Sequence, residues 1–191
     1  MGIFFISAIQ FAHAQEVTAF GTSFTFGEDG RPVDAFPMKL QEKLTLKGNK
    51  VTVYNFSQSG LTTVDLLNRV EKIPKESKVV IFEYAVGNDQ RAGIKPDLTE
   101  KNAADAIRKI LASNKKVILL LRGLHEDRLK ALVERWTPFI KETGISYISI
   151  YQPPGKNAAP NKAYFHPTPE FHNEIADQLL GPVQILLGES K

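Results

Sequence analysis

The sequence predicts an α/β protein in which a five-stranded parallel sheet lies between two layers of helices. Three observations favour this flavodoxin-like, three-layer α/β/α sandwich. Short apolar segments rich in β-branched residues recur along the chain. There are five such segments, and amphipathic segments separate them. Strands of a parallel sheet that is covered on both faces are typically continuous apolar runs, because both of their faces are buried.

The predicted strands are apolar runs bounded by polar or glycine-containing segments. They alternate with helical patterns rather than following one another directly, which indicates crossover connections and therefore parallel pairing. In chain order the strands are Val17–Phe20, Lys50–Phe56, Val79–Tyr84, Val117–Leu121 and Tyr147–Tyr151.

The first long helix is predicted over residues 35–48. Its apolar positions Phe36, Leu40 and Leu44 recur every four residues, and Gly48 supplies the residue at which such a helix stops. Residues 64–73 form the next helix, with Thr62 or Thr63 as its N-terminal cap. The remaining helices are predicted over residues 98–114, over residues 126–144, and from near Thr168 to Leu187.

The chain is expected to form one domain over residues 15–191, because 191 residues suit a single core. Residues 1–14 carry no charged side chain and end in Ala12-His13-Ala14, which resembles a secretory signal peptide with its cleavage site. The segment lacks the usual basic residue near its start. The expectation is a periplasmic or secreted protein, or a cytoplasmic one if the start is misassigned.

Composition excludes several classes of site. The formal net charge is +3 and basic residues are interleaved with acidic ones, so no nucleic-acid surface is expected. The chain has no cysteine, which removes disulfides, thiolate metal sites and cysteine nucleophiles. No metal or cofactor is expected, nor a stable membrane span. The sequence leaves the oligomeric state open.

Polar residues suited to hydrolysis follow four of the predicted strands. Gly21-Thr22-Ser23 follows the first, residues 55–60 ("NFSQSG") the second, residues 86–89 ("VGND") the third, and His166 precedes the last helix. The carboxyl ends of parallel strands meet at one edge of a sheet, where ligands bind. Acyl transfer needs a nucleophile, a base within reach of it, and donors for the developing oxyanion. Taken alone, Ser23 could equally be a turn residue or part of a phosphate-binding loop.

These segments together resemble the sequence blocks of the SGNH hydrolases, the GDSL-type esterases and lipases, and among them the bacterial arylesterases and lysophospholipase-like acyl hydrolases. The resemblance covers the chain from Glu16 onward. It implies that Ser23 is the nucleophile and His166 the general base. It also implies that the oxyanion is held by the N–H groups of Ser23 and Gly60 and by the side chain of Asn88. The implied substrate is a small-molecule ester or a lipid.

The sequence departs from the family pattern at three positions. Thr22 replaces the aspartate of the first block, Val86 replaces the leading glycine of the third, and Ala163 replaces the acid three residues before the histidine. Because that acid normally orients the imidazole, the sequence suggests a Ser-His dyad whose Nδ1 proton goes to a backbone carbonyl. Glu170 is the possible acid substitute, although its ordinary role would be to stabilise a helix N-terminus.

Two other readings stay open at this stage. One is a family member with lost or weak catalysis that binds acyl or glycan ligands, which the alanine at position 163 makes credible. The other is a flavodoxin-like phosphate- or cofactor-binding module in which "GTSFTFG" opens a helix. Asp89 is expected to hold its loop through backbone hydrogen bonds, and His172 is expected to be exposed.

Overall fold

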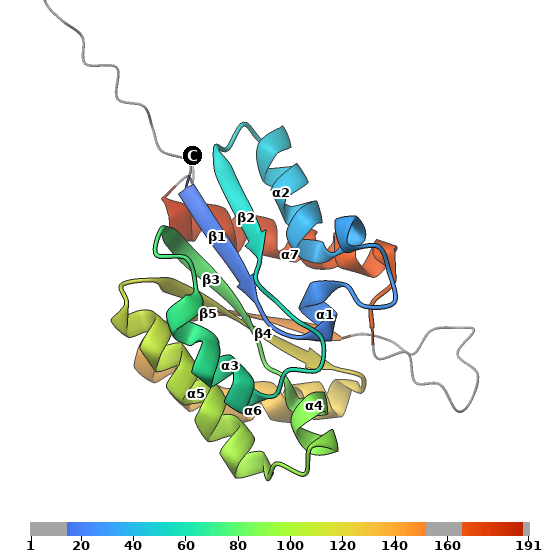
Figure 1. Cartoon of the computed structure of the whole chain (residues 1–191), viewed down its shortest axis with the longest axis vertical. Coiled ribbons are helices and arrows are strands. Elements are labelled where there is room, and N and C mark those ends of the chain that lie inside the picture. The colour runs from blue at the N-terminus through green and yellow to red at the C-terminus, as the bar shows by residue number, and fades with distance from the viewer. Residues whose placement is uncertain (1–14, 152–165, 189–191) are drawn as a thin grey trace, which may run out of the picture.

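The computed structural model of the chain describes residues 15–151 and 166–188 (Figure 1). The predicted signal peptide and Ala163 lie outside these residues. All five predicted strands are present, each within a few residues of its expected bounds: β1 Gln15–Phe20, β2 Val51–Asn55, β3 Ser77–Glu83, β4 Lys116–Gly123 and β5 Ser146–Tyr151.

The strands form one parallel sheet in the order β2-β1-β3-β4-β5. The chain therefore leaves β1 toward one edge and returns past it to β3. In a doubly wound sheet this reversal opens a crevice between the carboxyl ends of the two neighbouring strands, and ligands bind there. The turn after β1 and the end of β3 are consequently the first places to look for a functional site.

The long helices cover both faces of the sheet, as Figure 1 shows. On one face α2 and α7 pack on the strands, and on the other face α3, α5 and α6 do so. Their bounds are α2 Phe36–Leu46, α3 Thr63–Arg69, α5 Pro96–Ala112, α6 Glu126–Thr143 and α7 Pro169–Leu187. Among the described residues, no helix combines the length and the apolar character that crossing a membrane requires.

The central strands divide their side chains between the two cores. Val79 and Ile81 of β3 belong to the core under α2 and α7, whereas Val80 and Phe82 belong to the other core. This alternation within an uninterrupted apolar run follows from the period of two along a strand. Burying a charged side chain in such a run costs free energy unless hydrogen bonds or an opposite charge compensate it. Strand β3 ends at such a charged residue, Glu83.

The helix ends follow the signals in the sequence. Thr62 caps α3 in a reciprocal capping box with Asp65, and Thr168 caps α7. Gly48 has φ 79° just after α2, in the left-handed region that ends helices without strain in glycine. Short helices that the sequence pattern did not indicate also occur: α1 Ser23–Phe26, η1 Pro32–Asp34, η2 Val70–Lys72 and α4 Val86–Arg91.

Candidate active site

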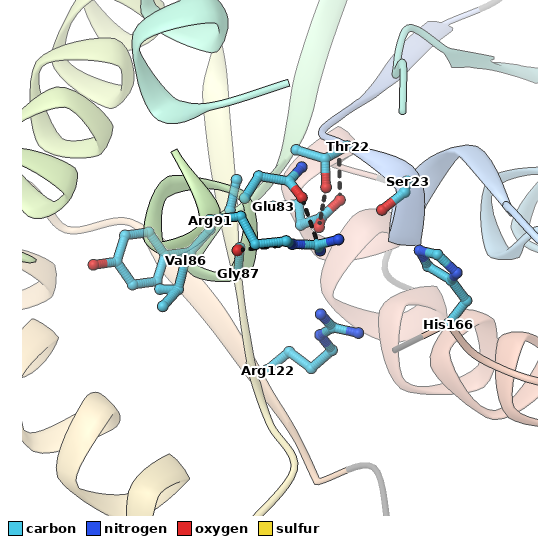
Figure 2. A pocket seen from close by; sticks show the side chains of 11 residues that line it. Thr22, Ser23, Glu83, Val86, Gly87, Arg91, Arg122 and His166 are labelled. Atoms are coloured by element: carbon cyan, nitrogen blue, oxygen red, sulfur yellow. Dashed lines mark hydrogen bonds between the residues drawn. The ribbon is translucent and has the colours of Figure 1, made fainter. Parts of the chain in front are cut away.

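A small pocket opens at the carboxyl edge of the sheet, at the crevice between β1 and β3. Its volume is about 40 Å³. Figure 2 shows Ser23 and His166 next to each other on one side of it, with Arg91 and Arg122 facing them. The pocket is lined by Thr22, Ser23, Glu83, Tyr84, Ala85, Val86, Gly87, Asn88, Arg91, Arg122 and His166.

Ser23 is the first residue of α1 and is 8% exposed. Because the first N–H groups of a helix have no acceptor within it, the Ser23 N–H has no partner inside α1. The next side chain, Phe24, is fully buried in the core beneath α2 and α7. The turn after β1 thus presents the serine to the pocket while its neighbour anchors the turn in the core.

The turn that carries Ser23 is held by the buried carboxylate of Glu83. Its Oε1 accepts a hydrogen bond from Thr22 Oγ1 at 2.7 Å. Its Oε2 accepts hydrogen bonds from Thr22 N at 2.8 Å, Thr25 N at 3.2 Å and Thr25 Oγ1 at 2.6 Å. Glu83 is 3% exposed, so these bonds replace the hydration that the charge has lost.

This arrangement explains the departure at position 22. The threonine hydroxyl donates to Glu83 from the neighbouring strand, so the turn obtains its polar anchor from β3. Glu83 was not among the residues selected from the sequence. The signal that was available is an acid inside "VVIFEYA", since an unpaired carboxylate is almost never buried in such a run.

Gly21 is required by the same close approach. A Cβ at this position would collide with Oε2 of Glu83 and would lie 2.5 Å from Thr25 Oγ1. Neither atom can move away without giving up a hydrogen bond to its partner. Any larger residue here would therefore separate the turn from β3.

The hydroxyl groups on this turn are not equivalent. Those of Thr22 and Thr25 both donate to Glu83, whereas the Ser23 side chain lines the pocket. A hydroxyl that already donates to a buried carboxylate has no proton to give to a base. Of these three residues, Ser23 is therefore the one whose hydroxyl is placed for chemistry.

Asn88 also lines the pocket, but one of its amide hydrogens is already used. Its Nδ2 donates to the carbonyl of Leu61 at 2.7 Å, and its Oδ1 accepts from Arg91 Nη2 at 3.1 Å. Gly60 is exposed, has φ 79°, and is not among the described residues that line the pocket. Asn88 thus tethers the loop containing Gly60 to the start of α4.

Asp89 does hold neighbouring segments together, through one backbone and one side-chain bond. Its carboxylate accepts hydrogen bonds from the N–H of Thr63 at 2.7 Å and from the Thr63 hydroxyl. Thr63 is the first residue of α3, so the carboxylate also faces a helix N-terminus, where negative charge is favoured. Asp89 is 1% exposed and is not among the residues that line the pocket.

The wall opposite Ser23 carries positive charge. Arg122 extends from the end of β4, and its guanidinium carbon lies 4.5 Å from the centre of the Phe24 ring. Burial lowers the pKa of Arg122, and the charge of Glu83 opposes this effect. Guanidinium groups remain protonated in proteins, so the pocket combines the cations of Arg91 and Arg122 with the anion of Glu83.

His166 reaches the pocket from the segment just before α7. Its side chain is 16% exposed, and its Nδ1 lies 2.6 Å from Oδ2 of Asp29. Its Nε2 lies 3.6 Å from Oε2 of Glu28. The expectation from the sequence was a backbone carbonyl at Nδ1. Among the described residues, the group at Nδ1 is instead the carboxylate of Asp29, from the loop after α1. No motif in the sequence points to Asp29, which is distant from His166 along the chain.

Glu170, the carboxylate suggested as the acid substitute, interacts elsewhere. Hydrogen bonds from its own backbone N–H and from the Thr168 hydroxyl lower its pKa. Glu170 lies in the first turn of α7, where a carboxylate stabilises the helix terminus. Among the described residues, the carboxylates beside His166 are those of Glu28 and Asp29.

The expectation that His172 is exposed was wrong. The side chain is 3% exposed and stacks against Phe36, and its Nδ1 accepts a hydrogen bond from the Phe36 N–H at 3.1 Å. It lies on the face of α7 that also carries Ile175, Ala176 and Leu179. Polar neighbours in sequence concealed this apolar face.

His172 should make stability depend on pH. Burial lowers the pKa of His172 from 6.5 to about 4. Between these two pH values, His172 is therefore protonated in the unfolded chain but remains neutral in the folded protein. The contribution of the neutral His172 to the free energy of unfolding is therefore complete above pH 6.5, and it declines by roughly 3 kcal/mol in all as the pH falls to 4. Denaturant unfolding between these pH values should show a shallower decline for His172→Asn than for the wild type. Parallel declines would contradict this assignment.

No group of three or more His, Cys, Asp or Glu side chains that could hold a metal ion occurs in residues 15–151 and 166–188. The pocket contains the Ser23 hydroxyl, the His166 imidazole with a carboxylate at its Nδ1, amide donors and two guanidinium groups. The hydroxyl, the imidazole with its carboxylate and the amide donors are the groups that acyl transfer by a serine nucleophile uses.

Comparison with solved structures supports the fold. The psychrotrophic esterase EstA from Pseudoalteromonas sp. aligns with a TM-score of 0.74 at 18% identity, over 91% of this chain and 99% of that one. TesA aligns with a TM-score of 0.74 at 20% identity, over 90% and 99%. AlinE4, described as an SGNH-hydrolase family esterase, aligns with a TM-score of 0.62 at 20% identity, over 91% and 97%.

A comparison with curated protein sequences gave no match. The model of the GDSL-like Lipase/Acylhydrolase family, by contrast, matches residues 19–173, which include Ser23, Asn88 and His166. The match extends over most of the chain and over every strand except the first residues of β1. The chain therefore belongs to the GDSL-like lipase/acylhydrolase family.

Proposed function

We propose that the protein is a serine esterase that hydrolyses carboxylic esters through an acyl-enzyme at Ser23, with His166 as general base. One observation carries the proposal. The Ser23 hydroxyl lines the same pocket as His166, while both neighbouring threonine hydroxyls are committed to Glu83. Residues 143 positions apart in sequence meet there, at the edge of the sheet where ligands bind in this fold.

The proposed reaction has two halves. As the Ser23 oxygen attacks the ester carbon, its proton moves to Nε2 of His166, and the carbonyl electron pair moves onto the carbonyl oxygen. Collapse of this intermediate expels the alcohol, which takes the proton from His166. Water then attacks the acyl-enzyme in the same manner, giving the carboxylic acid and restoring the Ser23 hydroxyl.

The oxyanion is proposed to be held by the N–H of Ser23, the N–H of Gly60 and the side chain of Asn88. The position of Ser23 at the start of α1, where its N–H has no acceptor within the helix, supports the first assignment. Asn88 uses one amide hydrogen on Leu61, which leaves its second hydrogen for the substrate. Gly60 does not line the described pocket, and its assignment is supported by this same bond, which ties the residue after Gly60 to Asn88.

The described part of the pocket favours a short acyl group. Its volume of about 40 Å³ is close to the space of a single water-sized group, and charged and polar residues form most of its wall. A space this small and polar favours a short acyl group over a long alkyl chain, which would have to extend beyond the pocket. We therefore favour a short-chain esterase, of the arylesterase kind, over a lysophospholipase-like enzyme.

Turnover of p-nitrophenyl esters of increasing acyl length tests this function. We expect kcat/KM for the acetate to exceed that for the octanoate by at least about tenfold. A value that rises with chain length would contradict the short-acyl preference but not the esterase. Absence of turnover with every ester, combined with measurable binding of acyl or glycan ligands, would contradict the esterase and favour a binding protein.

A further inference from the structure

To act as the base, His166 needs a partner that keeps its Nε2 unprotonated. A base that accepts the serine proton at Nε2 must carry its own proton on Nδ1. The acceptor at Nδ1 decides which nitrogen is protonated. In this protein that acceptor cannot be an acid in residues 152–165, because this segment contains no aspartate or glutamate.

We propose that Asp29 is the positioning residue for His166. Its Oδ2 lies 2.6 Å from Nδ1, which is hydrogen-bonding distance. An ionised carboxylate can only accept, so this contact places the proton on Nδ1 and leaves the lone pair on Nε2. The inference rests on the proposed function, because it concerns how the base of that reaction is oriented.

The backbone around Asp29 supports this role. Asp29 has φ 67°, a left-handed conformation that aspartate tolerates better than most residues. The loop starts from the nucleophile itself, since the N–H groups of Gly27 and Glu28 both donate to the Ser23 carbonyl, at 3.1 and 3.0 Å. Nucleophile and positioning carboxylate are therefore built on one short segment, and His166 is held against it.

Neighbouring carboxylates do not occupy this position. Glu28 accepts a hydrogen bond from the Ser59 hydroxyl at 2.5 Å and lies 3.6 Å from Nε2, beyond hydrogen-bonding distance. Glu170 interacts with Thr168 and with its own backbone. Within the described parts of the chain, Asp29 is the carboxylate that hydrogen-bonds Nδ1.

The effect of Asp29 should be smaller than that of a buried triad acid. The Asp29 side chain is 74% exposed, and solvent weakens interactions between exposed charges. Neutralising the buried acid of a serine protease lowers kcat by about 10⁴. For Asp29 we expect a smaller reduction, of about 10-fold to 10³-fold, because solvent screens an exposed carboxylate.

Asp29→Asn and Asp29→Gly separate charge from structure. Asparagine preserves the shape and tolerates the left-handed backbone, while glycine removes the side chain without straining the positive φ. Glu170→Gln is the matched control, because it neutralises a carboxylate near His166 in sequence that interacts elsewhere. His166→Ala reports on the base itself. Thermal unfolding of each variant checks that the fold is retained.

Both Asp29 variants should lower kcat for p-nitrophenyl acetate by at least about tenfold, with KM changed less than about twofold, because positioning acts on the transition state. The control should keep wild-type kcat. In proton NMR, the downfield signal of the His166 Nδ1 proton should be present in the wild type and in the control, and absent in Asp29→Gly.

The outcomes distinguish this inference from the function on which it rests. If His166→Ala keeps wild-type activity, the proposed esterase mechanism is wrong. If His166→Ala is inactive while both Asp29 variants keep wild-type kcat, only the role of Asp29 is wrong. A downfield proton signal that persists in Asp29→Gly would likewise overturn the assignment, because another acceptor would then hold Nδ1.

Discussion

Ester hydrolysis should fall by a factor of about 10³ to 10⁶ when Ser23 is replaced by alanine, because removal of a serine nucleophile alone abolishes nearly all catalysis in such enzymes. The fold should persist, since the substitution removes one oxygen that lines the pocket and leaves the Glu83 hydrogen bonds in place. The measurement is kcat/KM for p-nitrophenyl acetate, with thermal unfolding as the check on the fold.

Ser57→Ala is the matched control for this prediction. The Ser57 hydroxyl donates to the carbonyl of Ala19 at 3.3 Å, near the same end of β1, but Ser57 is not among the residues that line the pocket. Its replacement should leave kcat/KM within about threefold of the wild type, as expected of a residue outside the reacting centre. Equal activity of Ser23→Ala and the wild type would exclude Ser23 as the nucleophile.

Glu83→Ala should lower both stability and activity. It leaves the N–H and hydroxyl groups of Thr22 and Thr25 without their buried acceptor. We expect a loss of about 3–5 kcal/mol in the free energy of unfolding, because several buried donors lose a charged acceptor at once. At this chain length, each kcal/mol lowers Tm by about 2–4 °C.

Glu83→Gln is the control that keeps the shape of the side chain. Its amide oxygen can still accept from the Thr22 and Thr25 N–H groups, so its cost should be less than half that of Glu83→Ala. Activity should follow the same order, because the turn that presents Ser23 is held by these bonds. Equal stability of all three proteins would show that Glu83 does not anchor the turn.

The sheet could be predicted because its signal is local. Each strand is an apolar run that can be recognised without knowing which strands lie beside it. The residues that begin and end the long helices can likewise be recognised in the sequence. The short helices α1 and α4 could not be predicted in this way. With four and six residues, they are too short to show a helical period, and they form because the residues around them are already held.

The candidate site was predictable only in part, for a related physical reason. Ser23, Asn88 and His166 each follow a recognisable strand or precede a recognisable helix, so their common edge could be inferred. The partners of these groups could not, because the contacts of Glu83 with Thr22 and of Asp29 with His166 join segments far apart in sequence. His172 was misjudged because its burial depends on which face of α7 meets α2.

The central claim is that Ser23 and His166 act together on an acyl carbonyl. Its most direct test is labelling of the wild-type protein with a fluorophosphonate, followed by mass spectrometry of the modified peptide. The account predicts a single adduct on Ser23, formed at least about 100-fold more slowly in His166→Ala because the hydroxyl then lacks its base. An adduct on another residue, or labelling of Ser23 at the same rate without the His166 imidazole, would contradict it.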